Sequence, residues 1–226
     1  MKNKNYGIFN FAFIDNIIEK KRIEMLNILN KAINKEDVKS FLDIGTTEEN
    51  KLKSSNFFVK KLDHIKIKKS ISDQRIESFR FSEFKKKSIT SEFSTEEINI
   101  FKSDLVISSA TIEHVGNFNN QIKMIKNIIC LTKKYFLITT PNRFFPIDFH
   151  TKLPFLHMLP KKIHRMILTL LNLKEYAKEE NLNLLGYSDL NKLINAQKNV
   201  DFEIKIFKIK LLGLTSNLLI LGKKYQ

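Results

Sequence analysis

Short apolar runs bounded by polar residues recur along the chain. The run 105–107, between Asp104 and Ser108, has the length of a strand covered on both faces of a parallel sheet, where apolar residues are continuous. Residues 64–71 instead alternate between polar and apolar positions. Strands are therefore predicted near residues 38–47, 64–71, 86–90, 105–107, 135–140, 200–209 and 215–222.

Segments with helical spacing separate these runs. Ile14, Ile18 and other apolar residues share one face of a predicted helix over 14–34. Apolar positions spaced by four, three and four, from Phe118 to Ile129, predict another helix, which Asn117 or Asn119 could cap. Further predictions are a loop or short helix over 91–102, a helix over 161–173, and a helix capped by Ser188.

The order of these elements predicts one α/β domain. Strands that alternate with helices are typical of a mostly parallel sheet. The last two strands follow each other around Gly213, so an antiparallel pair is expected there. No repeat and no Gly/Ser/Pro-rich linker divides residues 1–226. Within this single domain, 1–35 is expected to be a helical lead-in, and the proline-broken segment 150–185 an insertion.

The chain is strongly basic, with a net charge of +15. Such a charge favours nucleic-acid binding when the basic residues cluster. Here the lysines are scattered among abundant Asn, Ile and Phe, and runs such as 85–87 are short. The charge therefore indicates compositional bias and non-specific attraction, and no specific nucleic-acid partner is predicted.

The compartment follows from the cysteine and from the apolar segments. Cys130 is the single cysteine, so no internal disulfide forms, and this agrees with a reducing compartment. The apolar run 8–14 is short and is interrupted by Asn10, unlike a signal peptide. No uninterrupted apolar run approaches the roughly 18–20 residues of a spanning helix. We expect a cytoplasmic protein.

Chemically active side chains gather where predicted strands end. Asp43 and Gly45 close the first strand, and a glycine there permits positive φ and close approach of a ligand to the backbone. The loops 109–116 and 141–150 follow two later strands. In open α/β sheets such loops line the ligand crevice, so this edge is the predicted site.

Four motifs carry a resemblance to a known family. They are FLDIG at 41–45, SDLVISS at 103–109, IEHV at 112–115 and TPN at 140–142. In this order and spacing the chain resembles class I S-adenosylmethionine-dependent methyltransferases of the small-molecule or glycan type. The resemblance implies a Rossmann-like, mostly parallel seven-stranded sheet with helices on both faces and an antiparallel last strand.

The resemblance also implies where the cofactor S-adenosylmethionine binds. It should lie over the turn after the first strand, with an acid near its ribose and the end of the central strand beside its methionine or adenine portion. The cofactor-binding residues implied are Asp43, Gly45, Thr46, Thr47, Asp73, Ser109 and Ala110. The turn departs from the family pattern, because Thr46 and Thr47 follow Gly45 where further glycines are usual.

The acceptor, the molecule that receives the methyl group, is expected to bind between the IEHV motif and the loop after TPN, on the side where the insertion 150–185 lies. His114 is the candidate general base because the reference pKa of histidine lies near working pH, and Glu113 and His150 are the other candidate catalytic residues. A histidine that only fixes its loop is the alternative for His114. The implied reaction is methyl transfer to a hydroxyl or similar group of a small-molecule, sugar or cell-envelope glycan acceptor.

Two other classes of function stay open. The missing glycines after Gly45 are compatible with a non-catalytic binding or scaffold protein on a degenerate methyltransferase fold, and the net charge is compatible with an RNA methyltransferase. A nicotinamide dehydrogenase is disfavoured because no G-x-G-x-x-G follows the first strand.

Metal and membrane binding are further alternatives. Some methyltransferases with a Glu-His motif bind a divalent ion, but these usually have another carboxylate three residues before the glutamate. Ala110 occupies that position here, so no metal is predicted. Residues 153–173 have a basic start and an apolar continuation, which is compatible with peripheral contact with an anionic membrane as well as with ordinary packing.

Overall fold

The computed structural model describes residues 11–49, 51–197 and 200–225. The predicted domain and its helical lead-in therefore extend in part beyond the described residues, as do residues 8–10 of the apolar run 8–14. The strands are β1 (Ser40–Ile44), β2 (Ile67–Ser72), β3 (Glu83–Lys86), β4 (Ser103–Ser109), β5 (Thr132–Pro141), β6 (Phe202–Leu211) and β7 (Leu214–Lys224). The α-helices are α1 (Phe11–Ala32), α2 (Phe57–Lys61), α3 (Thr95–Phe101), α4 (Phe118–Leu131), α5 (Lys161–Leu170), α6 (Lys174–Ala177) and α7 (Tyr187–Asn195), with 3₁₀ turns η1 (Lys35–Asp37), η2 (Ile112–His114) and η3 (Leu156–Met158).

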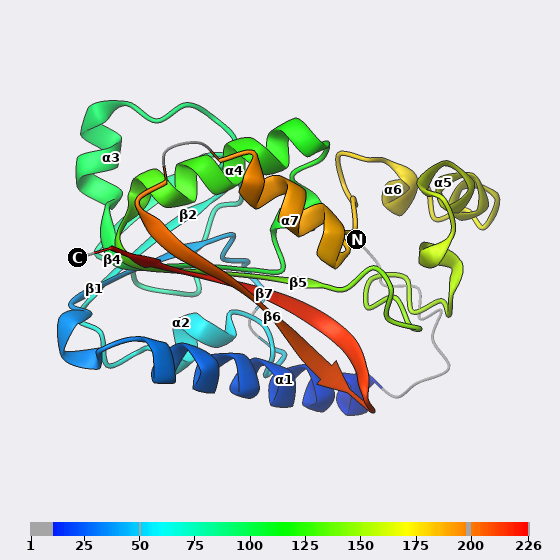
Figure 1. The fold of residues 1–226 in the computed structure, drawn as a ribbon, viewed down its shortest axis with the longest axis horizontal. Coiled ribbons are helices and arrows are strands. Elements are labelled where there is room, and N and C mark those ends of the chain that lie inside the picture. Colours follow the sequence, from blue (N-terminus) through cyan, green and yellow to red (C-terminus); the bar gives the residue numbers. More distant parts are fainter. Residues whose placement is uncertain (1–10, 50, 198–199, 226) are drawn as a thin grey trace.

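The strands form one seven-stranded sheet in the order β3-β2-β1-β4-β5-β7-β6. The neighbouring pairs β3–β2, β2–β1, β1–β4 and β4–β5 are parallel, whereas β7 is antiparallel to both β5 and β6. In Figure 1, α1 and α2 lie on one side of the sheet and α3, α4 and α7 on the other. The predicted fold class is confirmed, including its antiparallel last strand.

Two hydrophobic cores explain the continuous apolar runs. Val106 and Phe136 point into the core under α4 and α7, whereas Leu105, Ile107 and Leu137 point into the core that α1 and α2 cover. Successive residues of a strand face opposite sides, so a strand with helices on both faces needs apolar residues at every position. All five of these side chains are completely buried.

Local hydrogen bonds set where the helices begin. The side chain of Asn117 accepts a hydrogen bond from the backbone N–H of Asn120, so Asn117, one of the two candidate residues, caps α4. Before α3, Ser94 and Glu97 cap each other's backbone N–H groups. The segment 91–102, open between loop and short helix, therefore contains a capped helix.

Several predicted bounds were wrong: the helix predicted over 161–173 ends at Leu170, and the third strand and the last helix are also displaced. The third strand is Glu83–Lys86 rather than 86–90, because Ser88 begins a turn that is closed by the N–H of Ser91 on its carbonyl. Ser188 lies inside α7 instead of capping it. Gly186 is the N-cap, and its N–H donates to the carboxylate of Asp189 in the first turn of the helix.

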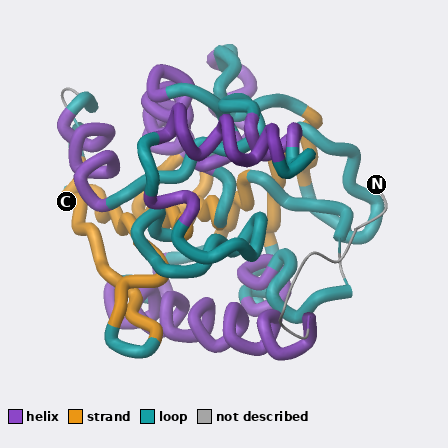
Figure 2. The backbone as a smooth tube through the Cα atoms, turned by 90° about the vertical axis from the view of Figure 1, so that its right-hand side faces the viewer, coloured by secondary structure: helices purple, strands orange, loops and turns teal. Residues whose placement is uncertain are grey.

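Loops gather at the carboxyl ends of the parallel strands. Figure 2, viewed from that end of the sheet, shows loops filling the space between the helical layers, with α1 running along the bottom. Strand order reverses between β1 and β4, which is where ligands bind in open α/β sheets. Among the described residues, no helix is long and apolar enough to cross a membrane.

Candidate active site

A tight turn follows β1. Gly45 has φ of +90°, and its N–H donates to the carbonyl of Ile71 on the neighbouring strand β2. A Cβ atom added to Gly45 would lie 2.3 Å from Oγ1 of Thr111, so the loop after β4 packs directly against this glycine. The turn therefore requires glycine for its backbone conformation and for space.

Asp43 is a buried acid beneath this turn. Its carboxylate accepts a hydrogen bond from the hydroxyl of Thr46 at 2.5 Å, and that hydroxyl also lies 2.8 Å from the hydroxyl of Ser70. Burial raises the pKa of Asp43 to about 6, although the hydrogen bond from Thr46 and the charge of Arg22 act in the opposite direction. A cation placed beside Asp43 would offset this cost of burial.

Asn56 holds the rest of the turn in place. Its side-chain oxygen accepts from the N–H of Thr47, and its amide donates to the carbonyls of Thr47 and Glu49. These three bonds give backbone groups after Gly45 a fixed position in the absence of further glycines. The scaffold interpretation rested on those missing glycines, and Asn56 supplies an alternative way to order the turn.

A second turn follows β4. Ala110 has φ of +54°, an uncommon conformation for a residue with a Cβ, and its N–H donates to the carbonyl of Thr139 on β5. The hydroxyls of Ser109 and Thr139 lie 3.0 Å apart. Strained backbone of this kind costs of order 1 kcal/mol or more and concentrates at functional sites.

Three cavities meet at Ala110. The first lies over β1 and β2, the second over β1 and the start of α2, and the third between α1 and the end of β5. The lining of the first cavity includes Gly45, Asp73, Thr90 and His114. The lining of the second includes Arg22, Asp43, Thr47 and Ser109. The lining of the third includes Arg22, Thr140, Phe149 and His150. The second shares Gly45 and Thr47 with the first and Arg22 with the third, so the three adjoin one another, and together they are called the crevice below.

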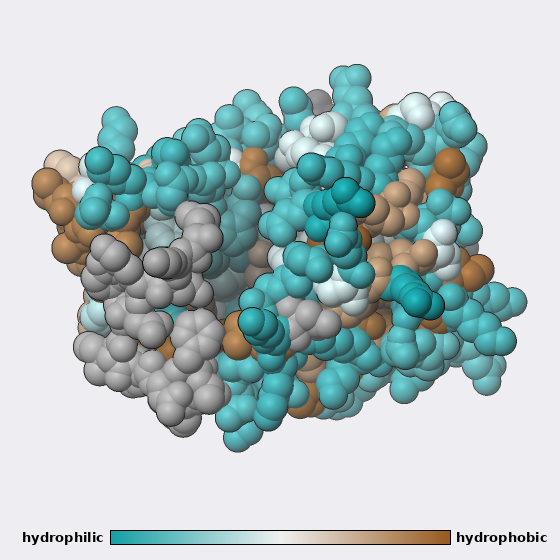
Figure 3. All heavy atoms as spheres, turned by 180° about the vertical axis from the view of Figure 1, so that it is seen from behind, coloured by the Kyte–Doolittle hydropathy of each residue, from teal (hydrophilic) through white to brown (hydrophobic). Residues whose placement is uncertain are grey.

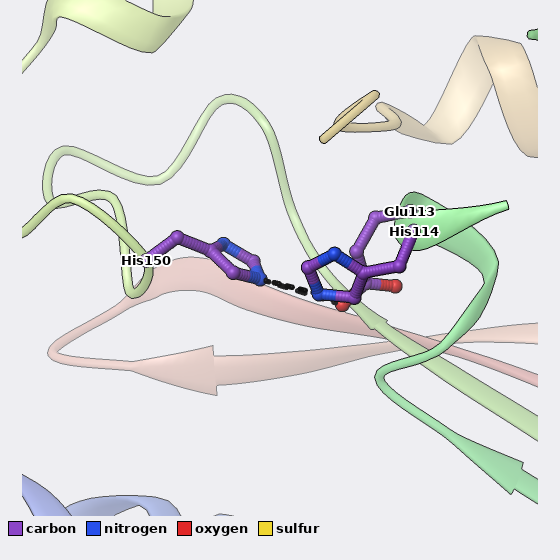
Figure 4. A group of neighbouring side chains, drawn as sticks. All are labelled: Glu113, His114 and His150. Atoms are coloured by element: carbon purple, nitrogen blue, oxygen red, sulfur yellow. Dashed lines mark hydrogen bonds and ion pairs between the residues drawn. The ribbon is translucent and has the colours of Figure 1, made fainter. Parts of the chain in front are cut away.

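Glu113, His114 and His150 form a cluster beside this crevice. In Figure 4 the two imidazole rings point toward each other, His114 from the turn after β4 and His150 from the loop after β5. Their Nε2 atoms lie 3.1 Å apart, and Nε2 of His150 lies 3.8 Å from Oε1 of Glu113. Glu113 is completely buried, and its other oxygen accepts a hydrogen bond from Thr140 at 2.9 Å.

Hydrogen bonds donated by the Nδ1 atoms orient both rings. Nδ1 of His114 lies 2.6 Å from the carbonyl of Asn181, and Nδ1 of His150 lies 3.2 Å from the carboxylate of Asp148. Burial lowers the pKa of His150, but the hydrogen bond and charge of Asp148 and the charge of Glu113 outweigh it and raise that pKa overall. The hydrogen bonds and charges around Asp148 hold its own pKa well below the usual range despite its burial.

Arg22 of α1 faces the crevice from the opposite side. It lines two of the three cavities, and the charges of Glu113, Asp43 and Asp15 act on it. Burial nevertheless lowers its pKa below that of an exposed arginine. Arg22 gives the crevice a positive charge between the turn after β1 and the Glu113 cluster.

The structure brings most of the predicted site residues to this crevice. Asp73 is exposed and lines the cavity over β2, whereas Thr46 is buried beneath the turn and lines none of the cavities described above. Thr46 therefore contacts Asp43 instead of facing the crevice. His157 holds its loop, since its Nε2 lies 2.6 Å from the carbonyl of Phe145.

Sequence reasoning missed Arg22, Asn56 and Asp148. Arg22 follows two lysines in an amphipathic helix, and nothing in its spacing separates it from a solvent-facing charge. Asn56 lies between predicted elements. Asp148 lies two residues before His150, and an acid at that spacing from a candidate catalytic histidine was the one available signal.

Comparison with known proteins identifies the fold. No family model and no curated protein sequence matches the chain. Among solved structures, the N-methyltransferase NodS from Bradyrhizobium japonicum WM9 has a TM-score of 0.54 at 12% identity over 94% of this chain and 99% of that chain. Magnesium protoporphyrin IX methyltransferase (ChlM) from Synechocystis PCC 6803, with bound SAM, has a TM-score of 0.53 at 9% identity over 97% of this chain and 86% of that chain.

A third similar structure carries the name of Zn-dependent alcohol dehydrogenases, from Rhodobacter sphaeroides. Its TM-score is 0.51 at 11% identity over 83% of this chain and 84% of that chain. The dinucleotide-binding dehydrogenase sheet has the order 3-2-1-4-5-6, whereas this sheet has β7 between β5 and β6 and antiparallel to both. The chain has the fold of the S-adenosylmethionine-dependent methyltransferases. The resemblance seen in the sequence is thus confirmed for the methyltransferase fold.

Proposed function

We propose that this protein is an S-adenosylmethionine-dependent methyltransferase. The observation that carries the proposal is the crevice itself, which joins Asp43 and Gly45 at one end to His150 at the other across Ala110. It lies at the switch point between β1 and β4, on a fold shared with ChlM, whose structure contains bound SAM.

Opposite charges in the crevice fit the amino-acid portion of the cofactor. The buried carboxylate of Asp43 suits an ammonium group, and the guanidinium of Arg22 suits a carboxylate at the other side of the same cavity. The backbone at Gly45, held by Asn56 and by the strand β2, leaves room for close approach. Asp73 lines the adjoining cavity, where a ribose would lie.

The Glu113, His114 and His150 cluster supports an acceptor site at the other end. His150 lines the cavity between α1 and β5 together with Thr140 and Phe149, which offers an aromatic wall and hydrogen-bonding groups. The cofactor supplies an electrophilic methyl group, and the protein holds an acceptor hydroxyl in line with it. The hydroxyl proton is taken up within the cluster, where imidazole nitrogens and a carboxylate are available.

The exposed apolar face of α5 supports the proposal that the acceptor, such as a glycan, is attached to a lipid. Ile163, Met166 and Leu170 are 43%, 58% and 78% exposed on one face of α5, and Lys162 is exposed beside them. Figure 3 shows apolar surface at the left edge of the molecule, where α5 lies in this view. An amphipathic helix with this composition suits contact with an anionic membrane surface, and the lone Cys130 supports a cytoplasmic location.

Methyl transfer from labelled S-adenosylmethionine to a panel of sugars, sugar nucleotides and lipid-linked saccharides tests the proposal. His114→Ala and His150→Ala should lower turnover by roughly 10²–10⁴-fold, as for loss of a proton acceptor. The affinity for S-adenosylhomocysteine should stay within about twofold for His150→Ala, whereas His114→Ala should also weaken it, because His114 lines the cavity assigned to the ribose. Equal damage to cofactor affinity in both variants would show that the acceptor site is placed in the wrong part of the crevice.

A further inference from the structure

The two facing Nε2 atoms of His114 and His150 present a chemical conflict. A carbonyl oxygen only accepts hydrogen bonds, so the contact with Asn181 places the proton of neutral His114 on Nδ1 and a lone pair on Nε2. The carboxylate of Asp148 does the same for His150. Two lone pairs at 3.1 Å repel each other unless a proton or a cation lies between them.

Glu113 adds a third unsatisfied group to this gap. Its Oε1 is completely buried and makes no hydrogen bond to the described residues. A proton between the two imidazole rings leaves Oε1 without a partner, because Nε2 of His150 is 3.8 Å away. A cation bound to both nitrogens and to Oε1 would satisfy all three groups at once.

We propose that Glu113, His114 and His150 form a binding site for one divalent transition-metal ion. Metal–nitrogen bonds of about 2.0–2.1 Å at angles between octahedral and tetrahedral place two ligand nitrogens about 2.9–3.4 Å apart, which includes the observed separation. One ligand atom from each of the three residues lies within 4.8 Å of the others. A small side-chain movement of Glu113 completes the set.

The outer contacts are those of metal-binding histidines. Such histidines donate their second ring N–H to a carboxylate or a backbone carbonyl, which fixes the tautomer and the ring orientation. Asp148 and Asn181 fill these two roles, and Thr140 orients the carboxylate of Glu113. Asp148 is itself held by the hydroxyl of Thr151 at 2.6 Å.

Two imidazoles and one carboxylate select the class of metal. This donor set suits Zn²⁺, Fe²⁺, Co²⁺ or Mn²⁺, whereas Mg²⁺ and Ca²⁺ prefer oxygen ligands. Ala110 adds no ligand, so coordination positions remain open toward the cavity that His150 lines. The proposal rests on the acceptor side of the proposed function. The Nε2 atoms would hold the ion and would then not take up the acceptor proton, whose loss the ion would favour instead by polarising the acceptor oxygen. Metal binding is measured without methyl transfer, so either proposal can fail independently.

Titration with Co²⁺, followed by its visible absorption, tests the site directly. The experiment uses the full chain with Cys130→Ser, because that exposed thiol is a competing ligand. We expect one equivalent to bind and to be displaced by Zn²⁺. His150→Ala and the isosteric Glu113→Gln should weaken binding at least tenfold, and Asp148→Asn by about 10–100-fold through the orientation of His150.

His64→Ala is the matched control, since His64 is exposed and distant from the cluster in sequence, and it should leave Co²⁺ affinity unchanged. Melting temperatures report whether each variant is folded, and His150→Ala alone suffices if Glu113→Gln unfolds. Absence of Co²⁺ binding to the parent protein at millimolar metal overturns the proposal. Binding that survives both His150→Ala and Glu113→Gln does so as well.

Discussion

The sharpest structural prediction concerns Gly45→Ala. The added methyl group would meet Oγ1 of Thr111 at 2.3 Å and Cγ2 of the same side chain at 2.9 Å, on a backbone with φ of +90°. The variant therefore combines conformational strain with a steric clash. Both costs arise at the turn that we assign to the cofactor.

Gly213→Ala separates the two costs. Gly213 has φ of +81° in the turn between β6 and β7, and an added Cβ would have no neighbour within 4 Å. A left-handed conformation costs a residue with a Cβ roughly 1–2 kcal/mol, while the stiffer unfolded chain offsets part of this. We expect a net loss of about 1 kcal/mol in the free energy of unfolding for Gly213→Ala.

The clash at Gly45 adds to this strain. Forcing a methyl group into packed space costs typically about 1–3 kcal/mol, so Gly45→Ala should lose about 2–4 kcal/mol in total. For a chain of this length each kcal/mol lowers the melting temperature by about 2–4 °C. Chemical and thermal denaturation of both glycine variants measure these differences.

Thr111→Ala provides the second arm of a double-mutant cycle. It removes Oγ1 and Cγ2 and leaves Cβ 3.2 Å from the new methyl group. The double variant should recover about 1–3 kcal/mol relative to the sum of the single variants. Equal losses for Gly45→Ala and Gly213→Ala, with no coupling to Thr111→Ala, would refute the packing described for this turn.

Three further predictions follow from charge and surface. Burial raises the pKa of Asp43 from 3.8 to about 6, so its ionisation destabilises the folded protein by an amount that is absent below about pH 4 and reaches about 3 kcal/mol above pH 6. Denaturation at each pH should therefore show Asp43→Asn becoming more stable relative to the parent protein between about pH 4 and pH 6. A stability difference that does not depend on pH would contradict this pKa. Co-sedimentation with anionic phospholipid vesicles should fall for Met166→Ser/Leu170→Ser but not for Leu214→Ser, which changes an exposed apolar residue at the start of β7. Equal binding by the parent protein and both variants would remove the membrane proposal. Binding to RNA and duplex DNA should be weak, uniform across sequences and lost by roughly 200 mM salt, whereas tight selective binding would favour the RNA methyltransferase alternative.

Much of the fold was predictable because a strand that is buried on both faces of a parallel sheet needs a continuous run of apolar residues, which can be seen in the sequence. The run 105–107 and the spacing after Asn117 identified β4 and α4 for this reason. The edge strand β3 was placed too late, since its side chains are largely exposed and its pairing with β2 depends on the backbone. Short exposed strands carry no comparable pattern.

The site was predictable only where chemistry and strand ends coincide. Asp43, Gly45 and His150 could be assigned because they follow predicted strands or belong to the motifs. Arg22 could not, because only the packing of α1 across the sheet brings it to the crevice. The facing lone pairs of the two histidines likewise depend on tautomers that distant backbone and carboxylate groups impose.

Calorimetric titration with S-adenosylhomocysteine tests the central claim most directly. The purified protein should bind one equivalent, and Asp43→Ala and Arg22→Ala should each weaken binding by at least tenfold, with circular dichroism spectra that match the parent protein. Reduced nicotinamide adenine dinucleotide should not compete. Absence of detectable binding at millimolar S-adenosylhomocysteine would contradict the account and favour a non-catalytic protein on a methyltransferase fold.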